Sequence, residues 1–163
     1  MIKLVQLSES DGVDVYKMLQ RIKTNENEFK NTANGLSFEE YKKWLIQQNN
    51  WSKGKDLPEG FVPQTVYWLF VDGRPVGFGK IRHKLNIHSR TIGGNLGYAI
   101  DPIFRGKGYA TVLLNLLVAK AKELGIGELL LSVEKSNPAS KRVIEKNGGT
   151  LYDENEARWF FTF

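Results

Sequence analysis

A glycine-rich basic turn between an apolar strand and a long helix constrains this chain more than any other feature. The turn, Arg105–Ala110, follows the strand-like segment Tyr98–Ile100 and precedes a stretch whose apolar residues recur at helical spacing over Gly108–Leu124. A near-continuous apolar run, Leu129–Glu134, comes next and is typical of a buried parallel strand. Because a strand–helix–strand crossover normally joins parallel strands, we expect the two strands that flank this helix to be parallel.

Periodicity and turn residues divide the rest of the chain into further elements. The expected strands cover residues 2–7, 65–71, 75–85, 91–100, 150–152 and 158–163, the expected helices residues 11–23, 37–48 and 138–147, and the expected loops residues 24–35 and 49–63. Ser10-Asp11 and Ser37 are the expected helix N-caps, and Ser37 has capping-box spacing to Glu40. This order predicts a mixed α/β fold with a largely antiparallel sheet.

The composition is that of a single globular domain, residues 1–163. The chain has no cysteine, which excludes disulfides, thiolate metal sites and a cysteine nucleophile. Two histidines, His83 and His88, leave little for a metal site, and we expect none. No apolar run reaches the ~18 residues of a membrane-spanning helix, and the start of the chain turns polar too early for a signal peptide. We therefore expect a cytoplasmic protein.

The net charge is +5, and the basic excess lies in the middle of the chain. Residues 51–100 carry seven basic and three acidic side chains, and no acid lies between Asp72 and Asp101. Such a field suits an anionic ligand, and it suits nucleic acid equally well. Within this region Lys80, Arg82 and Lys84 share one face of an expected strand. They could contact a phosphate or an acidic substrate, but we expect them to be solvated.

The turn at Arg105–Ala110 has the composition of a phosphate-binding site. The first N–H groups of a helix lack intrahelical partners and carry the positive end of the helix dipole. Gly106 and Gly108 let the backbone approach a bulky anion, while Arg105 and Lys107 add full charges. The Walker A pattern is absent. A Rossmann loop is excluded because the preceding strand belongs to an antiparallel run, and Glu128 lies at the start of the next strand instead of near its end.

The sequence from Arg105 to Ala110 matches the pattern Arg/Gln-x-x-Gly-x-Gly/Ala, and here the chain resembles the GNAT superfamily of acyl-CoA-dependent N-acyltransferases. A second segment, Ser132–Gly149, adds to the resemblance because it contains an Asn-x-x-Ser helix start and ends in a glycine-rich turn. The resemblance is strong over Gly94–Tyr152 and extends to the whole chain by element order. In detail the chain resembles a small bacterial branch of predicted acetyltransferases.

The resemblance implies a fold and a site for acetyl-CoA. The family's mostly antiparallel sheet carries about four helices and splays between the strands that flank helix 108–124, so that Gly93, Gly94 and Gly97 would lie near a bulge. The pyrophosphate would lie on the amides of Arg105, Gly106, Lys107, Gly108, Tyr109 and Ala110, and the pantetheine arm along Tyr98, Ala99 and Ile100, with help from Asn137 and Ser140.

The implied reaction is N-acetylation, in which a primary amine attacks the thioester directly in a ternary complex. The alkyl ammonium must first lose a proton, and the departing thiolate must gain one. Many relatives carry a tyrosine acid seven residues after the capping asparagine, where this chain has Ile144. Ser140 is therefore the candidate acid. Glu134 and His83 are the candidate bases, and a chain of water molecules is the third alternative.

No motif identifies the acceptor, which we expect to be an amine of a small molecule or a peptide. Trp51 and Phe61, in the expected loop 49–63, are candidates to line its pocket. The resemblance points to a homodimer, with Arg158–Phe163 as the first place to look for its interface. Nothing indicates a membrane or nucleic-acid partner except the net charge.

Two alternative functions stay open. A catalytically silent acyl-CoA-binding module is supported by the missing tyrosine and by the absence of an acid in the expected strand 91–100. A basic nucleic-acid-binding domain is supported only by the charge, and steep salt dependence of binding would be its signature.

Overall fold

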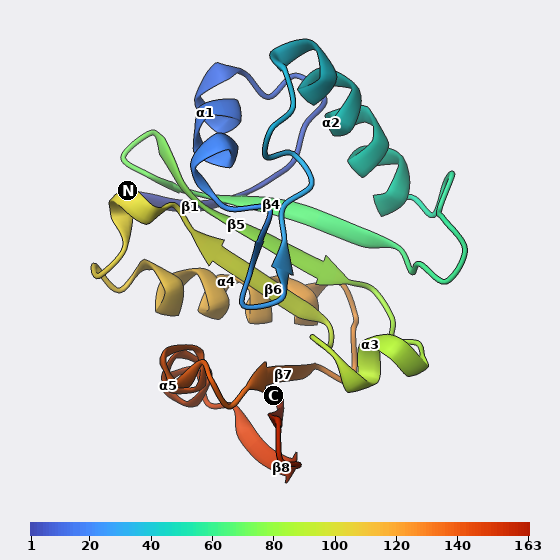
Figure 1. Cartoon of the computed structure of the whole chain (residues 1–163), viewed down its shortest axis with the longest axis vertical. Coiled ribbons are helices and arrows are strands. Elements are labelled where there is room, and N and C mark those ends of the chain that lie inside the picture. Colours follow the sequence, from blue (N-terminus) through green and yellow to red (C-terminus); the bar gives the residue numbers. More distant parts are fainter.

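Two antiparallel sheets form the framework of the computed structural model, which describes all of residues 1–163 (Figure 1). The larger sheet has the strand order β1-β4-β5-β6, made of β1 (Ile2–Gln6), β4 (Gln64–Val71), β5 (Arg74–Arg82) and β6 (Leu96–Ile100). The smaller sheet has the order β7-β9-β8, made of β7 (Leu130–Glu134), β9 (Arg158–Thr162) and β8 (Thr150–Glu154). A short hairpin of β2 (Asn25–Glu26) and β3 (Phe29–Lys30) forms a separate two-stranded sheet.

Helices cover both faces of the larger sheet. On one face lie α1 (Val13–Arg21) and α2 (Phe38–Ser52), and on the other lies α4 (Tyr109–Glu123) with α5 (Pro138–Lys146) beside it (Figure 1). A short helix, α3 (Ile87–Thr91), and a 3-10 turn, Pro102–Phe104, flank β6. The sheet therefore separates two hydrophobic cores, one built around α4 and one in which α1 and α2 pack on Trp68 and Phe78.

Local sequence signals set most element boundaries. Ser37 and Glu40 form the expected capping box at the start of α2, and the Asn137 side chain accepts a hydrogen bond from the Ser140 amide at the start of α5. The expected cap at Ser10-Asp11 is wrong, because α1 begins after Gly12 without a side-chain cap. The Asp11 carboxylate instead accepts 2.8 Å hydrogen bonds from the Ser8 amide and the Trp68 indole N–H.

The region before β6 differs from the expected strand over residues 91–100. The chain forms α3 over Ile87–Thr91 and enters β6 only at Leu96. Gly94, at φ +72°, turns the chain between the two elements, and its missing Cβ would lie 2.2 Å from the carbonyl oxygen of Leu130. The glycines in this segment predicted a close approach by another part of the backbone. This approach exists, between Gly94 and Leu130, but it lies just before β6 and not within it.

The strands flanking α4 do not form a parallel hydrogen-bonded pair. They meet at one bridge of antiparallel type, Gly94 to Leu131, supported by a 2.7 Å hydrogen bond from the Asn95 amide to the Leu130 carbonyl. The apolar run in β7 has another cause, because β7 pairs antiparallel with β9 and buries its side chains among α4 and Phe161. The sheet is thus split between β6 and β7, as the resemblance implied.

The two expected loops contain regular secondary structure, and the last strand of the chain has a partner on each side. Residues 24–35 include the β2–β3 hairpin, and α2 runs on to Ser52. The apolar C-terminal strand β9 lies between β7 and β8, so that both of its edges are paired. The mixed α/β class with a largely antiparallel sheet is confirmed. None of the helices combines the length and the apolar character that a bilayer crossing requires.

Candidate functional site

The turn before α4 forms an open cradle of backbone amides. Gly106 and Gly108 have φ angles of +77° and +80°, and a Cβ on either would meet nothing within 4 Å. Gly108 is also the N-cap of α4 and provides no side chain to satisfy the first amides of the helix. Tyr109 and Ala110 begin the helix, and Lys107 is exposed beside them. The geometry fits a phosphate group, because unpaired N–H donors face open space at the positive end of a helix.

Arg105 has partners within the protein that the sequence did not indicate. Its Nε donates to the Ile100 carbonyl oxygen at 3.0 Å, and its Nη1 lies 2.8 Å from the carboxylate of Glu26. Glu26 belongs to the β2–β3 hairpin, so this guanidinium joins the amide cradle to the hairpin. A phosphate on the cradle would therefore compete with Glu26 for Arg105.

A side-chain hydrogen bond crosses from β6 to α5. The Tyr98 hydroxyl lies 2.6 Å from Ser140 Oγ, and the Ser140 amide donates to Asn137 Oδ1 at 3.3 Å. Burial raises the pKa of Tyr98 to about 12, although the hydrogen bond with Ser140 acts in the opposite direction. The structure thus brings together three of the residues expected to contact the pantetheine arm, and it adds a neutral phenol next to the candidate acid.

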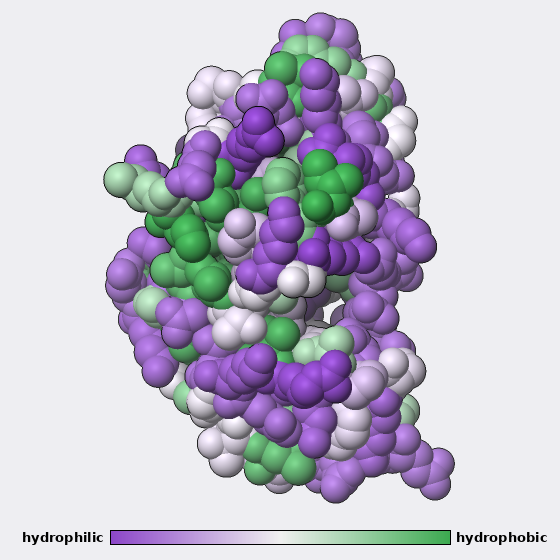
Figure 2. Space-filling model, turned by 90° about the vertical axis from the view of Figure 1, so that its left-hand side faces the viewer, coloured by the Kyte–Doolittle hydropathy of each residue, from purple (hydrophilic) through white to green (hydrophobic).

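The β2–β3 hairpin lies across the open side of the split. Phe29 packs over Gly97, whose Cβ would lie 3.3 Å from the ring. The Glu28 carboxylate binds the buried guanidinium of Arg158 on β9, which also donates 2.8 and 3.1 Å hydrogen bonds to Ser132 Oγ on β7. The hairpin therefore contacts both sheets, and it runs beside β6 in Figure 1. Figure 2 shows a hollow between the larger upper part of the molecule and the smaller lower part.

Lys80 and Arg82 face the same side of the sheet as the hairpin, and the expectation that they are freely solvated is wrong. The Lys80 ammonium donates to the Lys30 carbonyl and lies 4.8 Å from the centre of the Phe29 ring. Burial, followed by the positive charges of Arg82 and Lys30, lowers the pKa of Lys80 to about 7. Arg82 Nη1 donates to the Gly94 carbonyl at 2.8 Å, and burial lowers its pKa as well.

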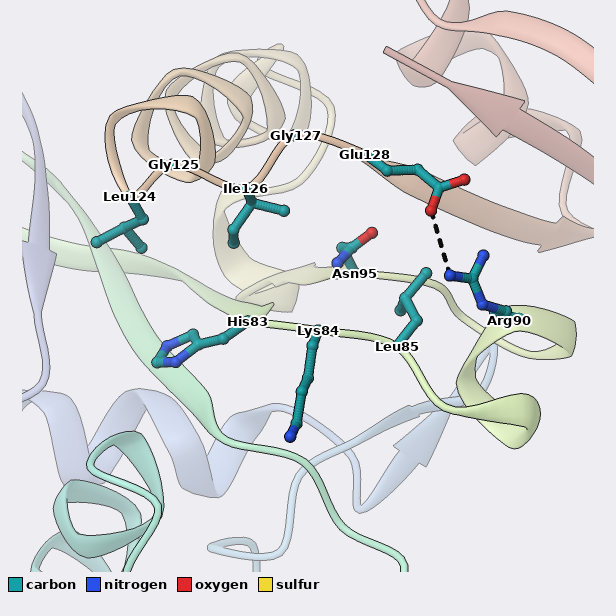
Figure 3. A pocket seen from close by; sticks show the side chains of 10 residues that line it. All are labelled: His83, Lys84, Leu85, Arg90, Asn95, Leu124, Gly125, Ile126, Gly127 and Glu128. Carbon is teal, nitrogen blue, oxygen red and sulfur yellow. Dashed lines mark hydrogen bonds and ion pairs between the residues drawn. The ribbon is translucent and has the colours of Figure 1, made fainter.

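His83 lies on the opposite face of the sheet, in a cavity of about 440 Å³ near the C-terminal end of α4 (Figure 3). Its Nε2 is 2.6 Å from Thr65 Oγ1, and desolvation lowers its pKa. An ion pair between Arg90 and Glu128, at 3.3 Å, borders the same cavity. Nothing here links His83 to the residues around the amide cradle.

Glu134 ends β7, pairs in register with Arg158 of β9, and is partly exposed. Its carboxylate accepts a 3.3 Å hydrogen bond from Ser136 Oγ and forms no hydrogen bond with His83 or Ser140. Of the three candidate catalytic residues, only Ser140 therefore makes a hydrogen bond to another expected site residue.

Trp51 and Phe61 do meet, but they pack on one another. Their rings form an edge-to-face pair with centroids 5.4 Å apart, and the Trp51 indole N–H donates to the Asp56 carbonyl. Trp44 and Trp68 belong to the core under α2. These four aromatic residues thus have structural partners.

Comparison with known proteins assigns the chain to a family. Residues 16–149 match the model of the acetyltransferase (GNAT) family. The chain belongs to the GNAT family. A mycothiol acetyltransferase from Thermomonospora curvata is 26% identical over 124 residues, which cover 74% of this chain but 39% of that relative. The chain therefore spans well under half the length of this relative.

Solved GNAT structures share the fold over the whole chain. The N-acetyltransferase PseH of Campylobacter jejuni, determined in complex with acetyl coenzyme A, is similar with a TM-score of 0.65 and 18% identity, covering 100% of this chain and 98% of PseH. RimL, a ribosomal L7/L12 α-N-protein acetyltransferase in complex with coenzyme A, reaches 0.73 at 17% identity, covering 99% and 93% of the two chains.

Sequence reasoning missed the residues that the hairpin brings to this GNAT site. Glu26, Glu28 and Phe29 lie in a segment expected to be a loop, and each contacts an element distant in the sequence. The one available signal was Phe29, a lone large apolar residue within a polar stretch. The sequence signal for an unpaired Lys80 was the absence of acidic residues between Asp72 and Asp101.

Proposed function

We propose that this chain is an N-acetyltransferase that moves the acetyl group of acetyl-CoA to a primary amine. The observation that carries the proposal is the open amide cradle at Gly106–Gly108, at the end of β6 and beside the split. Membership of the GNAT family supports it. The acceptor is an amine of a small molecule or a peptide, and it enters the split from the hairpin side.

In this proposal, the amides of residues 105–110 bind the pyrophosphate, and the backbone of Tyr98–Ile100 binds the pantetheine arm as an added strand. Asn137 fixes the start of α5 and thereby the position of Ser140. Ser140 Oγ donates a proton to the departing sulfur and regains one from the Tyr98 phenol, which its raised pKa keeps neutral beforehand and which solvent then reprotonates. Together they take the role that a tyrosine has in many relatives, at the position where this chain has Ile144.

Glu134 is the proposed base that removes the proton of the attacking ammonium. The geometry favours it over His83, because His83 lies in the cavity on the α4 face and bonds Thr65. We also propose a homodimer. Since β9 is paired on both edges, the interface falls on β8, whose five residues are all exposed at the edge of the smaller sheet.

Thermal unfolding with acetyl-CoA, CoA or NAD tests the cofactor site. A ligand at about 100 times its Kd adds about 2.7 kcal/mol, which for a chain of this size raises Tm by roughly 5–10 °C. We expect this increase with both CoA species and not with NAD. Gly108→Glu should abolish it, because a carboxylate would occupy the cradle. Gly60→Glu is the matched control, since Gly60 also has a positive φ and open space but lies in a distant loop.

Acetyl transfer from acetyl-CoA to a panel of amines then separates an enzyme from a silent binding module. Absence of any Tm increase at millimolar acetyl-CoA would refute the cofactor site. An increase without transfer to any amine would leave the binding module as the function.

A further inference from the structure

Lys80 and Arg82 are two neighbouring cations on β5 that have no anionic partner. The two other arginines beside the split are paired, Arg105 with Glu26 and Arg158 with Glu28. Lys80 and Arg82 form no ion pair at all. Two partly buried like charges in one place are unfavourable unless an anion offsets them.

Both side chains keep unused hydrogen-bond donors. An ammonium has three N–H donors and a guanidinium five. Lys80 donates only to the Lys30 carbonyl, and Arg82 only through Nη1 to the Gly94 carbonyl. Because no fully buried side-chain nitrogen in the molecule lacks a partner, Arg82 Nε and Nη2, which have none, reach solvent. A ligand can therefore reach the guanidinium of Arg82, and Lys80 lies two residues away on the same face of β5.

Desolvation and mutual repulsion weaken the charged form of Lys80. Burial acts first, and the charges of Arg82 and Lys30 add to it, so the pKa falls to about 7. No carboxylate acts in the opposite direction, since the nearest hairpin acids, Glu26 and Glu28, are held by arginines. An anion here would oppose both effects, because a nearby opposite charge favours the charged form of the lysine.

The two cations lie beside the split. Lys80 pairs in register with Gly97 of β6, and Arg82 binds the Gly94 carbonyl at the point where the two sheets meet. They face the hairpin side, away from α4 and from the cavity of His83. In the proposed reaction this is the side from which the acceptor amine approaches.

We propose that Lys80 and Arg82 bind an anionic group, a carboxylate or a phosphate, carried by the acceptor. This assignment rests on the proposed acetyl transfer and narrows its acceptors to amines that also bear a negative charge. The guanidinium of Arg82 provides the directional donors, and the ammonium of Lys80 acts as a point charge. Phe29, from the hairpin, covers the ammonium of Lys80, which lies 4.8 Å from the centre of its ring.

Matched amines that differ only in an anionic group test the specificity. We would compare acetylation of ε-aminocaproate with hexylamine, and of aminopropylphosphonate with propylamine. A charge-assisted contact predicts a kcat/KM about 10-fold higher for the anionic member of a pair. The pair that shows the larger ratio identifies carboxylate or phosphate as the preferred group. Lys80→Met and Arg82→Gln should each bring the ratio toward one, whereas Lys84→Met, at an exposed position two residues after the end of β5, should leave it unchanged.

Side-chain NMR of the wild-type protein tests the same site without turnover. Added acetate or inorganic phosphate should raise the measured pKa of Lys80 by about one pH unit, which corresponds to ~10-fold tighter binding to the charged form. Lys84 serves as the internal control. Equal rates within both amine pairs and an unchanged Lys80 pKa would overturn the anion site while leaving acetyl transfer intact. A shifted pKa in a protein that acetylates none of the amines would keep the anion site and reject the proposed function.

Discussion

Replacing Gly94 with alanine tests whether the close contact between the two sheets holds the split in its observed geometry. A Cβ at this position would lie 2.2 Å from the Leu130 carbonyl oxygen and 2.9 Å from Leu131 Cα, and the distances must open to at least 3.0 Å. Both obstacles are backbone atoms, so no side-chain rotation relieves them. The smaller sheet must move away, and the 2.7 Å hydrogen bond from the Asn95 amide to Leu130 is the first to be lost.

The expected destabilisation follows from three contributions. A non-glycine residue at φ +72° costs about 1–2 kcal/mol, the lost hydrogen bond about 1 kcal/mol, and the forced displacement about 1–3 kcal/mol. The free energy of unfolding should therefore fall by roughly 3–6 kcal/mol, and Tm by about 10 °C or more. Calorimetry or circular dichroism measures the change.

Gly93→Ala separates the contact from the backbone cost. Gly93 has a similar φ of +83°, but its Cβ would meet only the flexible end of Arg82 at 3.2 Å. This control should lose only the first contribution, about 1–2 kcal/mol. If Gly94→Ala melts within about 2 °C of Gly93→Ala, the two sheets are not fixed by this contact and the reasoning is refuted.

Three further changes test other parts of the structure. Tyr98→Phe removes the hydrogen bond to Ser140 and should lower kcat for acetyl transfer by roughly 100-fold with little change in KM; an unchanged kcat in steady-state kinetics would reject the proton pathway. Lys80→Met should raise the free energy of unfolding, measured in urea, most strongly below pH 7. The difference between variant and wild type should shrink by about 1.4 kcal/mol per pH unit from pH 7 to 10. In this range the wild-type lysine is neutral in the folded state but still charged in the unfolded state. Ser37→Ala should lower the free energy of unfolding by about 1 kcal/mol because α2 loses its N-cap. Ser10→Ala should leave Tm unchanged, because Ser10 caps no helix. An equal fall in Tm for the two variants would contradict the observed helix starts.

The features predicted correctly from the sequence are those set by neighbouring residues. The amide cradle needs only Gly106 and Gly108 before a helix, and the start of α5 needs only Asn137 followed by proline. Such signals act within one helical turn, so the sequence alone contains them. The order of these local signals along the chain was enough to predict the mixed α/β fold.

The features that sequence analysis missed depend on residues far apart in the chain. The hydrogen bond of Tyr98 spans 42 positions, and the ion pair of Glu28 with Arg158 spans 130. The expected parallel pairing of the strands around α4 failed for the same reason, since Gly94 turns the chain and β9 supplies the partner of β7. The periodicity of β7 shows that it is a buried strand, but it does not show whether β7 pairs with β6 or with β9.

The pairing of charges divides the cations around the split into two groups. Arg158 is buried and fully engaged, with Glu28 and Ser132 satisfying its guanidinium, so its charge serves to attach the hairpin to the smaller sheet. Arg105 joins the hairpin to the amide cradle through Glu26, and a bound phosphate would replace one anion by another at little electrostatic cost. Lys80 alone bears a strongly depressed pKa with no anion nearby. Its ammonium contacts the hairpin only through the Lys30 carbonyl and the Phe29 ring, so no anion offsets its charge or that of Arg82. The proposed negative group of the acceptor would offset both charges and would therefore lie under the hairpin.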